Sequence, residues 1–233
     1  MLVVLTLLTV GAAVVGVSSS PTVFYASLAP GNPRAAAELH AIVRRTMGAT
    51  SFTWHLPGLR ETLVYNAPNR IHDYMGSVPI QTIGVGTTFY FQASDLTNTQ
   101  SNAWLRIRHR PFGYSSANEY AMKYLTPLLS ASSVTLSGTT FVAEFVYLNE
   151  RFASGQMFER DVIRTDGRDV TSEQVEIQGI FPVESTRVET SYLTVTFSKI
   201  GTSPLVAPPI ARTINRGQPF CGPRTSGVSY CPA

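Results

Sequence analysis

The stretch NPRAAAELHAIVRRTMGATSFTW, residues 32–54, decides how the fold begins. Asn32 is a good helix N-cap, Pro33 suits the first helical position, and Gly48 is typical of a helix end. Apolar residues recur between them at helical spacing, namely Leu39, Ile42, Val43 and Met47. This pattern predicts an amphipathic helix of about four turns that docks one face on an apolar layer.

After this helix the pattern changes to short extended segments. We expect strands over 51–55, 60–65, 69–75, 79–85, 87–93 and 102–108, and later over 134–136, 141–148, 157–164, 175–181 and 191–199. The breaks, such as Pro57-Gly58 and Ala67-Pro68-Asn69, are short, which favours hairpins and therefore an antiparallel sheet.

A second helix is predicted to start at Ser116. The segment Ser116-Ala117-Asn118-Glu119 is a capping-box pattern, and apolar residues follow it. Pro127 is expected to kink or end this helix because proline removes a backbone donor. From Gly201 onward the chain is rich in Pro, Gly, Ser and Thr, and we expect it to be irregular.

The strand faces are unusually apolar. Phe89-Tyr90-Phe91 puts aromatic rings on both faces of one strand, whereas a sheet with one wet side alternates apolar and polar residues. Two helices cover only one face, so the sheet must curl on itself or leave an apolar hollow that holds an apolar ligand. The strand pattern leaves a closed barrel filled by its own side chains as the alternative.

The N-terminal segment carries no charge before Arg34. Residues 2–17 are nearly all aliphatic or small, a run that is short for a membrane span of about 20 residues but typical of a signal-peptide core. We therefore expect an exported, cell-envelope protein. Residues 1–32 are predicted to be a signal peptide or a retained membrane anchor with a short linker, 33–209 one domain, and 210–233 an irregular tail. Cys221 and Cys231 are predicted to form a disulfide in that tail, as suits an oxidising compartment, with two free thiols as the alternative.

Composition narrows the function. Charged residues make up 14% of the chain, against roughly 25% in average soluble domains. The net charge is only +3 and the basic residues are scattered, which argues against nucleic-acid binding. The short arginine cluster is interpreted as a solvated strand edge or as a rim that meets anionic headgroups; it consists of Arg106, Arg108 and Arg110.

Motifs for catalysis are not found in the sequence. The four histidines show no metal-binding spacing, and there is no Gly-x-Ser-x-Gly elbow or phosphate-binding glycine loop. We therefore predict no catalytic residue, no metal and no cofactor. One acidic group is interpreted as a solvated hairpin tip, with a calcium site as the weaker alternative: Asp161, Asp166, Asp169 and Glu173.

The order of these segments and their residue patterns resemble those of a known family. The helix Pro33–Met47 runs into Ser51-Phe52-Thr53-Trp54, hairpins include Arg70-Ile71-His72-Asp73-Tyr74 and Thr88-Phe89-Tyr90-Phe91, and the segment 194–201 is followed by Pro204 and Pro208-Pro209. Over roughly residues 34–209 this resembles the LolA-like lipoprotein-carrier fold, in particular the actinobacterial LppX/LprG type. The chain departs from that type in lacking the lipobox cysteine, and the family does not require the extension with Cys221 and Cys231.

The resemblance implies an α+β fold. Its sheet would be a curved antiparallel half-barrel with two main helices over the concave face and a lipid between them. The implied function is non-catalytic binding and carriage of a lipid or lipidated molecule at the envelope, with the membrane surface and an envelope transporter or protein as further partners. The expected lining residues are Trp54, Leu63, Tyr65, Ile71, Phe89, Phe91, Leu125 and Leu129. The alternatives are an anchored sensor or protein-interaction domain, and an enzyme that modifies envelope lipid or glycan.

Overall fold

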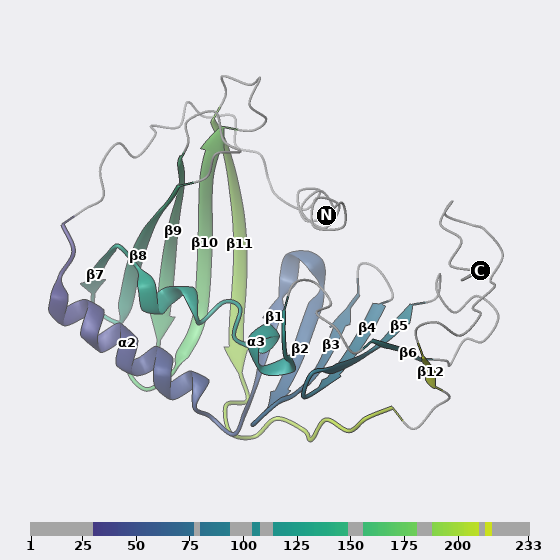
Figure 1. Ribbon diagram of the computed structural model, residues 1–233. Helices are drawn as coiled ribbons and strands as arrows, with labels where there is room; N and C mark the ends of the chain where they lie inside the picture. The colour runs from purple at the N-terminus through teal and green to yellow at the C-terminus, as the bar shows by residue number, and fades with distance from the viewer. Residues whose placement is uncertain are drawn as a thin grey trace. The chain divides into compact units, whose positions relative to one another are not determined.

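The computed structural model describes residues 30–76, 80–93, 104–107, 114–148, 156–180, 188–209 and 213–215. The described chain divides into two compact units, each built of antiparallel strands and a helix (Figure 1). The predicted α+β class is confirmed, and within each unit the sheet stays open rather than closing into a barrel. The prediction of one domain over residues 33–209 stays a prediction.

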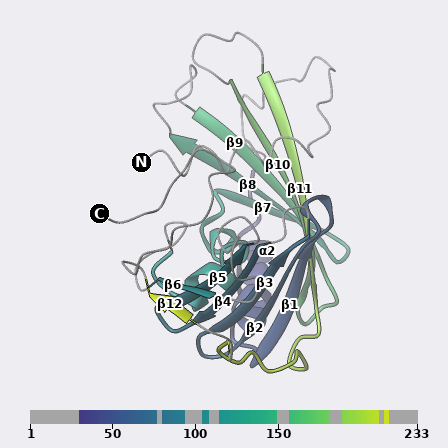
Figure 2. The same ribbon diagram turned by 90° about the vertical axis from the view of Figure 1, so that its right-hand side faces the viewer.

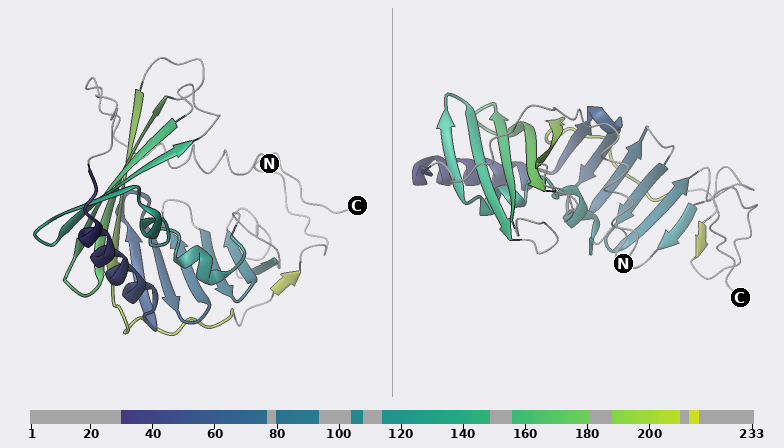
Figure 3. Two further views of the ribbon diagram at one scale, coloured as in Figure 1. Left: turned by 60° about the vertical axis from the view of Figure 1, so that its left-hand side comes forward. Right: turned by 90° about the horizontal axis from the view of Figure 1, so that it is seen from above.

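The first unit, which we call the α2 unit, holds helix α2 (Pro33–Met47), the short helix η3 (Pro127–Ser130) and five strands. The strands are β7 (Ser133–Ser137), β8 (Thr140–Leu148), β9 (Gln156–Thr165), β10 (Val170–Ile180) and β11 (Val188–Ser198). Their order is β11-β10-β9-β8-β7, all antiparallel. Helix α2 lies across one face of these strands, and both it and η3 are on that side (Figure 3).

The second unit, which we call the α3 unit, holds helix α3 (Ala117–Ala121) and seven strands. The strands are β1 (Ser51–Leu56), β2 (Glu61–Asn66), β3 (Arg70–Met75), β4 (Ile80–Val85), β5 (Thr88–Ala93), β6 (Trp104–Ile107) and β12 (Thr213–Asn215), with the turn η1 (Pro57–Leu59) after β1. Their order is β12-β6-β5-β4-β3-β2-β1, and β1 to β6 lie side by side (Figure 2).

Helix α2 begins and ends where the sequence predicts. The Asn32 side chain accepts hydrogen bonds from the backbone amides of Arg34 at 2.9 Å and Ala35 at 3.3 Å. Leu39, Ile42 and Val43 are buried, as their spacing predicts. Met47 is only half-buried, and Thr46 is the buried residue of the last turn.

Helix α3 is shorter than expected. Ser116 is its N-cap and accepts from the Glu119 amide at 3.1 Å, whereas the Glu119 carboxylate accepts from the amide of Ser115, at 2.7 Å, rather than from Ser116. The helix ends at Ala121, and Pro127 begins η3 instead of kinking a longer helix. The N-cap at Ser116 was therefore predicted correctly, but the reciprocal bond of the capping box and the length of the helix were not.

Two further corrections concern the second half of the chain. Strand β10 begins at Val170, five residues earlier than the predicted 175. The segment predicted to be irregular contains β12, which pairs with β6 in parallel. Within the part of the chain that is described, no helix is long and apolar enough to span a bilayer. Residues 1–29 of the predicted leader (1–32) and both cysteines lie outside that part.

Candidate functional site

Six of the eight predicted lining residues lie on one face of the α3 unit. We call this the inner face: it is the side of β1–β5 on which α3 packs. The strand registers place Leu63 opposite Asp73, Tyr65 opposite Ile71, and Phe89 opposite Gly84. The set is almost fully buried, with Phe91 the most exposed at 7%: Trp54, Leu63, Tyr65, Ile71, Phe89 and Phe91. The strand registers therefore bring these six residues to one side of the sheet, and their role as lining residues stays a prediction.

The other two predicted lining residues belong to the α2 unit. Leu125 is fully buried there, and Leu129 in η3 is half-buried. Their role as lining residues stays a prediction.

The predicted arginine rim is placed differently from the lining residues. Arg106 on β6 is the cross-strand partner of Tyr90, so it lies on the face opposite Phe89 and Phe91. Successive residues of a strand point to opposite faces, which is why Arg106 and Phe91 are separated. Arg108 and Arg110 lie outside the described residues. A headgroup role for the three arginines stays a prediction. Arg106 does not lie on the inner face.

The inner face also carries a polar cluster that the sequence analysis missed. Tyr120 of α3 donates its hydroxyl hydrogen to Asp73 at 2.8 Å. Lys123, two residues past α3, lies 3.6 Å from the Glu61 carboxylate and stacks over the rings of Trp54 at 4.7 Å and Tyr120 at 4.4 Å. Glu61 and Asp73 are 3% and 5% exposed, so two carboxyl groups are buried within an aromatic surface. We call Glu61, Asp73, Tyr120 and Lys123 the α3 clasp.

Burial dominates the electrostatics of the α3 clasp. Loss of solvation, with the negative charge of Glu61 beside it, raises the pKa of Asp73 to about 7, against the opposing effects of Lys123 and Tyr120. The Oδ1 atom of Asp73 is buried and has no hydrogen-bond partner among the described residues. Near neutrality Asp73 therefore exchanges a proton inside an otherwise apolar wall.

Additional hydrogen bonds seat α3 on the sheet. The amide of Ala117 donates to the Gly86 carbonyl at 2.9 Å, and the amide of Asn118 donates to the side chain of Asn69 at 2.7 Å. The Tyr65 hydroxyl donates to the Asn118 side chain at 2.8 Å. Gly84 permits this close approach, because a Cβ there would lie 2.9 Å from the Cβ of Ala117.

The opposite face of the α3 unit is closed by the chain after β11. The amide of Ser203 donates to the Ser51 hydroxyl. The Asn66 side chain donates to the Pro204 carbonyl and accepts from the Val206 amide. Val206 packs against Ile83 and Trp104. The predicted Pro-rich exit is therefore an ordered strap held by buried polar contacts. On the inner face, among the described elements, α3 packs against β2 and β3.

The α2 unit contains a second pair of buried acids. Asp161 on β9 and Glu173 on β10 are 0% and 2% exposed, and neither oxygen of Asp161 has a hydrogen-bond partner at good geometry in the described structure. Burial and the charge of Glu159 raise the pKa of Asp161 to about 8, and burial and Asp161 raise the pKa of Glu173 well above its usual value. Both carboxyl groups therefore hold their protons more tightly than exposed acids do.

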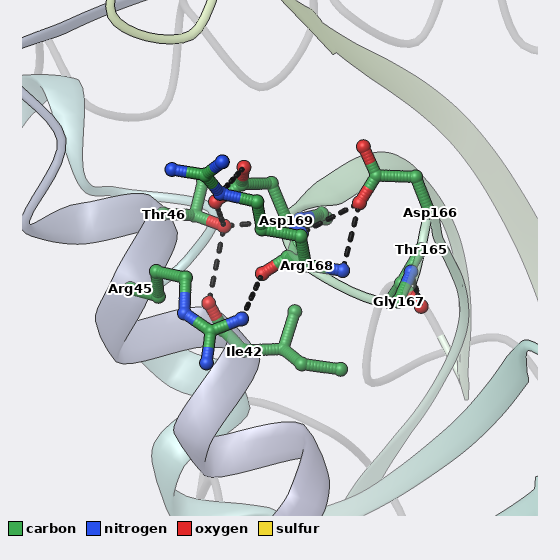
Figure 4. Close-up of polar contacts among 9 residues, drawn as sticks. Ile42, Arg45, Thr46, Thr165, Asp166, Gly167, Arg168 and Asp169 are labelled. Carbon is green, nitrogen blue, oxygen red and sulfur yellow. Dashed lines mark hydrogen bonds and ion pairs between the residues drawn. The ribbon is translucent and has the colours of Figure 1, made fainter.

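In the hairpin between β9 and β10 the four acids lie in two separate places, and Figure 4 shows Asp166 and Asp169 at the turn. Asp166 accepts from the amides of Arg168 and Asp169 at 2.8 and 2.7 Å, as a turn-forming aspartate does. Thr46 of α2 accepts from the Val170 amide at 3.0 Å and approaches Asp169 at 3.5 Å. Asp161 and Glu173 lie deeper in the strands. Over the described ranges no three His, Cys, Asp or Glu side chains are placed to hold a metal ion.

The missed residues had a signal in the sequence. Glu61 lies two residues from Leu63, and Asp73 two from Ile71, so each acid falls on the apolar side of its strand. The same holds for Asp161 and Ile163. An acid at an inward position is costly unless it is protonated or paired, and is therefore a candidate for function.

Comparison with known proteins finds similar folds only among solved structures. No family model and no curated protein matches this sequence. Among solved structures, the chain is similar to LprF from Mycobacterium bovis, with 9% identity, a TM-score of 0.41, and coverage of 77% of this chain and 98% of LprF. The predicted resemblance and this similarity point to the same kind of mycobacterial protein.

Proposed function

We propose that this protein binds a lipid or acylated molecule non-covalently at the cell envelope, on the inner face of the α3 unit. The observation that carries the proposal is the shared face of six large apolar residues, from Trp54 to Phe91, beneath a helix of only five residues. A face of this kind suits acyl chains, since each buried methylene contributes about 0.8 kcal/mol. Binding alone is proposed, without a chemical step.

The ligand must reach side chains that are already buried. Tyr120 and Lys123 contact the inner face through Asp73, Glu61 and Trp54. An acyl chain therefore contacts the aromatic residues only if α3 moves away from the sheet. Export by the N-terminal segment and contact with the membrane surface belong to the same proposal, because an envelope lipid is found only there.

Native mass spectrometry of the purified protein, with organic extraction of whatever it carries, tests this function. We expect a co-purified or added lipid to bind the native chain and to be lost in Phe91→Asp. The matched control is Gln92→Asp, which places the same charge one residue further along β5, on the opposite face. If Phe91→Asp does not fold by circular dichroism, Phe91→Ala takes its place. A native chain that binds no added lipid, or a Phe91 variant that binds as well as the control, refutes the proposal.

A further inference from the structure

The two helices are attached to their sheets in different ways. Helix α2 spans 15 residues and buries apolar side chains, Leu39, Ile42 and Val43 among them. Helix α3 has five residues, of which Ala117, Tyr120 and Ala121 are buried. A helix this short is not stable without tertiary contacts. Tyr120 of α3 donates a hydrogen bond to Asp73 on β3, and Lys123 just beyond α3 pairs with Glu61 on β2, so the strength of its attachment depends in part on the charge of these groups.

Titratable groups face one another across this attachment from every side. Asp73 on β3 is faced by Glu61 from β2, by Tyr120 from α3, and by Lys123 just beyond α3. Thr82 is its cross-strand neighbour on β4, and Trp54 of β1 covers Lys123. With Glu61 and Asp73 both ionised, the cluster holds two negative charges and one positive charge. With Asp73 protonated, the charges of Glu61 and Lys123 balance.

We propose that the α3 clasp is a proton-sensitive closure of the inner face, which holds α3 on the sheet in acid and releases it as the pH rises to neutrality. Ionisation places an uncompensated negative charge beside Glu61 in a site shielded from water, where charges repel strongly. Release of α3 returns Asp73 to solvent and relieves that repulsion. The response is a property of the chain alone; it rests on the proposed function only in that the opened face would admit the ligand.

The direction of the response follows from the protons bound in each state. Burial raises the pKa of Asp73 to about 7 with α3 seated, and release of α3 returns the carboxyl group to solvent, which lowers its pKa toward the ordinary value of 3.8. Between these values the seated form holds one more proton than the released form, so release is favoured as pH rises. The ratio of released to seated α3 should grow on the order of tenfold per pH unit between pH 4 and pH 7, and level off above.

Trp54 provides the readout. The chain has two tryptophans, so in Trp104→Phe the fluorescence comes from Trp54, which is fully buried beneath Lys123. Acrylamide quenching is measured from pH 4.5 to pH 8 on the full chain, shown by native mass spectrometry to carry no lipid. We expect quenching to rise with pH while the far-ultraviolet circular dichroism spectrum is unchanged.

Two variants in the Trp104→Phe background decide the mechanism. Asp73→Asn still accepts a hydrogen bond from Tyr120 but does not ionise, so its quenching should be independent of pH. Asp161→Asn removes a buried acid of the α2 unit and should keep the rise seen in the parent. If Asp73→Asn does not fold, Tyr120→Phe replaces it; loss of the donor disfavours the ionised form of Asp73, so the midpoint should move to higher pH.

The outcomes separate this inference from the proposed function. Quenching that does not change with pH, that rises equally in Asp73→Asn, or that becomes flat in Asp161→Asn overturns the proton-sensitive closure. Each of these results is obtained without lipid, so none of them bears on whether lipid binds. Conversely, a chain that binds no lipid can still show a pH response that depends on Asp73. That result would support the proton-sensitive closure and refute only the proposed lipid binding.

Discussion

Asp161 on β9 and Glu173 on β10 are diagonal neighbours on one face of the α2 unit, because Asp161 pairs with Val175 and Glu173 with Ile163. Burial raises the pKa of both carboxyl groups; the charge of Glu159 raises that of Asp161 further, and Asp161 raises that of Glu173. Acids with raised pKa values stabilise a fold only while they are protonated. The pair therefore links the stability of this unit to pH.

We predict that the protein becomes less stable as pH rises. The pKa of Asp161 is about 8 in the folded state, whereas an aspartate in the unfolded chain has its ordinary pKa of 3.8. Asp161 therefore keeps its proton to higher pH in the folded state. Its stabilising effect is complete below about pH 4 and is lost progressively up to about pH 8. Thermal unfolding from pH 4 to pH 9 should show a falling Tm, and Asp161→Asn should flatten the fall and raise Tm at pH 8.

Asp166 supplies the control for that measurement. Its pKa is lowered by the hydrogen bonds from the amides of Asp169 and Arg168, which favour the ionised form. Its stabilising effect is present above the ordinary pKa and lost in acid, the opposite direction. Asp166→Asn should therefore leave the loss at alkaline pH intact. If both variants flatten the curve equally, the buried pair is not its cause.

Thr46 is predicted to be essential for docking the last turn of α2. Its hydroxyl accepts from the Val170 amide at 3.0 Å and donates to the Ile42 carbonyl at 3.1 Å, and the residue is fully buried. Thr46→Val keeps the shape but leaves a buried amide without a partner, which should cost about 1–3 kcal/mol of unfolding free energy. Urea denaturation measures the loss. Thr46→Ser keeps the hydroxyl and should lose less; an equal loss would assign the effect to packing.

The Asn32 cap should contribute measurably to stability. Its side chain accepts from two amides of the first turn of α2, and these donors lose their partner in Asn32→Ala. Loss of an N-cap costs about 1 kcal/mol. Urea denaturation should show this loss for Asn32→Ala and almost none for Asn32→Asp, which caps equally well. A stable Asn32→Ala variant would mean that solvent satisfies these amides.

Local signals predicted the fold well. The cap at Asn32, the cap at Ser116 and the turns between strands depend on neighbours a few residues away, so they can be read from short stretches of sequence. The inner-face set, from Trp54 to Phe91, follows from period-two alternation. The length of α3 could not be predicted in this way, because it depends on how Tyr120 and Lys123 reach Asp73 and Glu61, about 50 to 60 residues away in the chain.

The buried acids were missed for a related reason. Composition scales count an aspartate as polar wherever it occurs, and only the strand pairing shows that Asp73 and Asp161 point inward. The strap from Gly201 to Val206 was predicted to be irregular because, apart from hydrogen bonds to Lys199, its contacts go to Ser51, Asn66 and Arg70, which are distant in the sequence. Long-range partners of this kind leave little trace in the local sequence.

Gly84 gives a last prediction, which concerns the seating of α3. A Cβ at this position would lie 2.7 Å from Cγ1 of Ile71 and 2.9 Å from Cβ of Ala117, both closer than atoms normally approach. Gly84→Ala should therefore push α3 off the sheet and cost about 1–3 kcal/mol, as overpacking does. Ala117→Gly removes one of the two clashes and should recover part of the loss. Urea denaturation of both single variants and the double variant measures the coupling. Purely additive effects would show that α3 does not contact Gly84. A favourable coupling would place α3 on the inner face in solution.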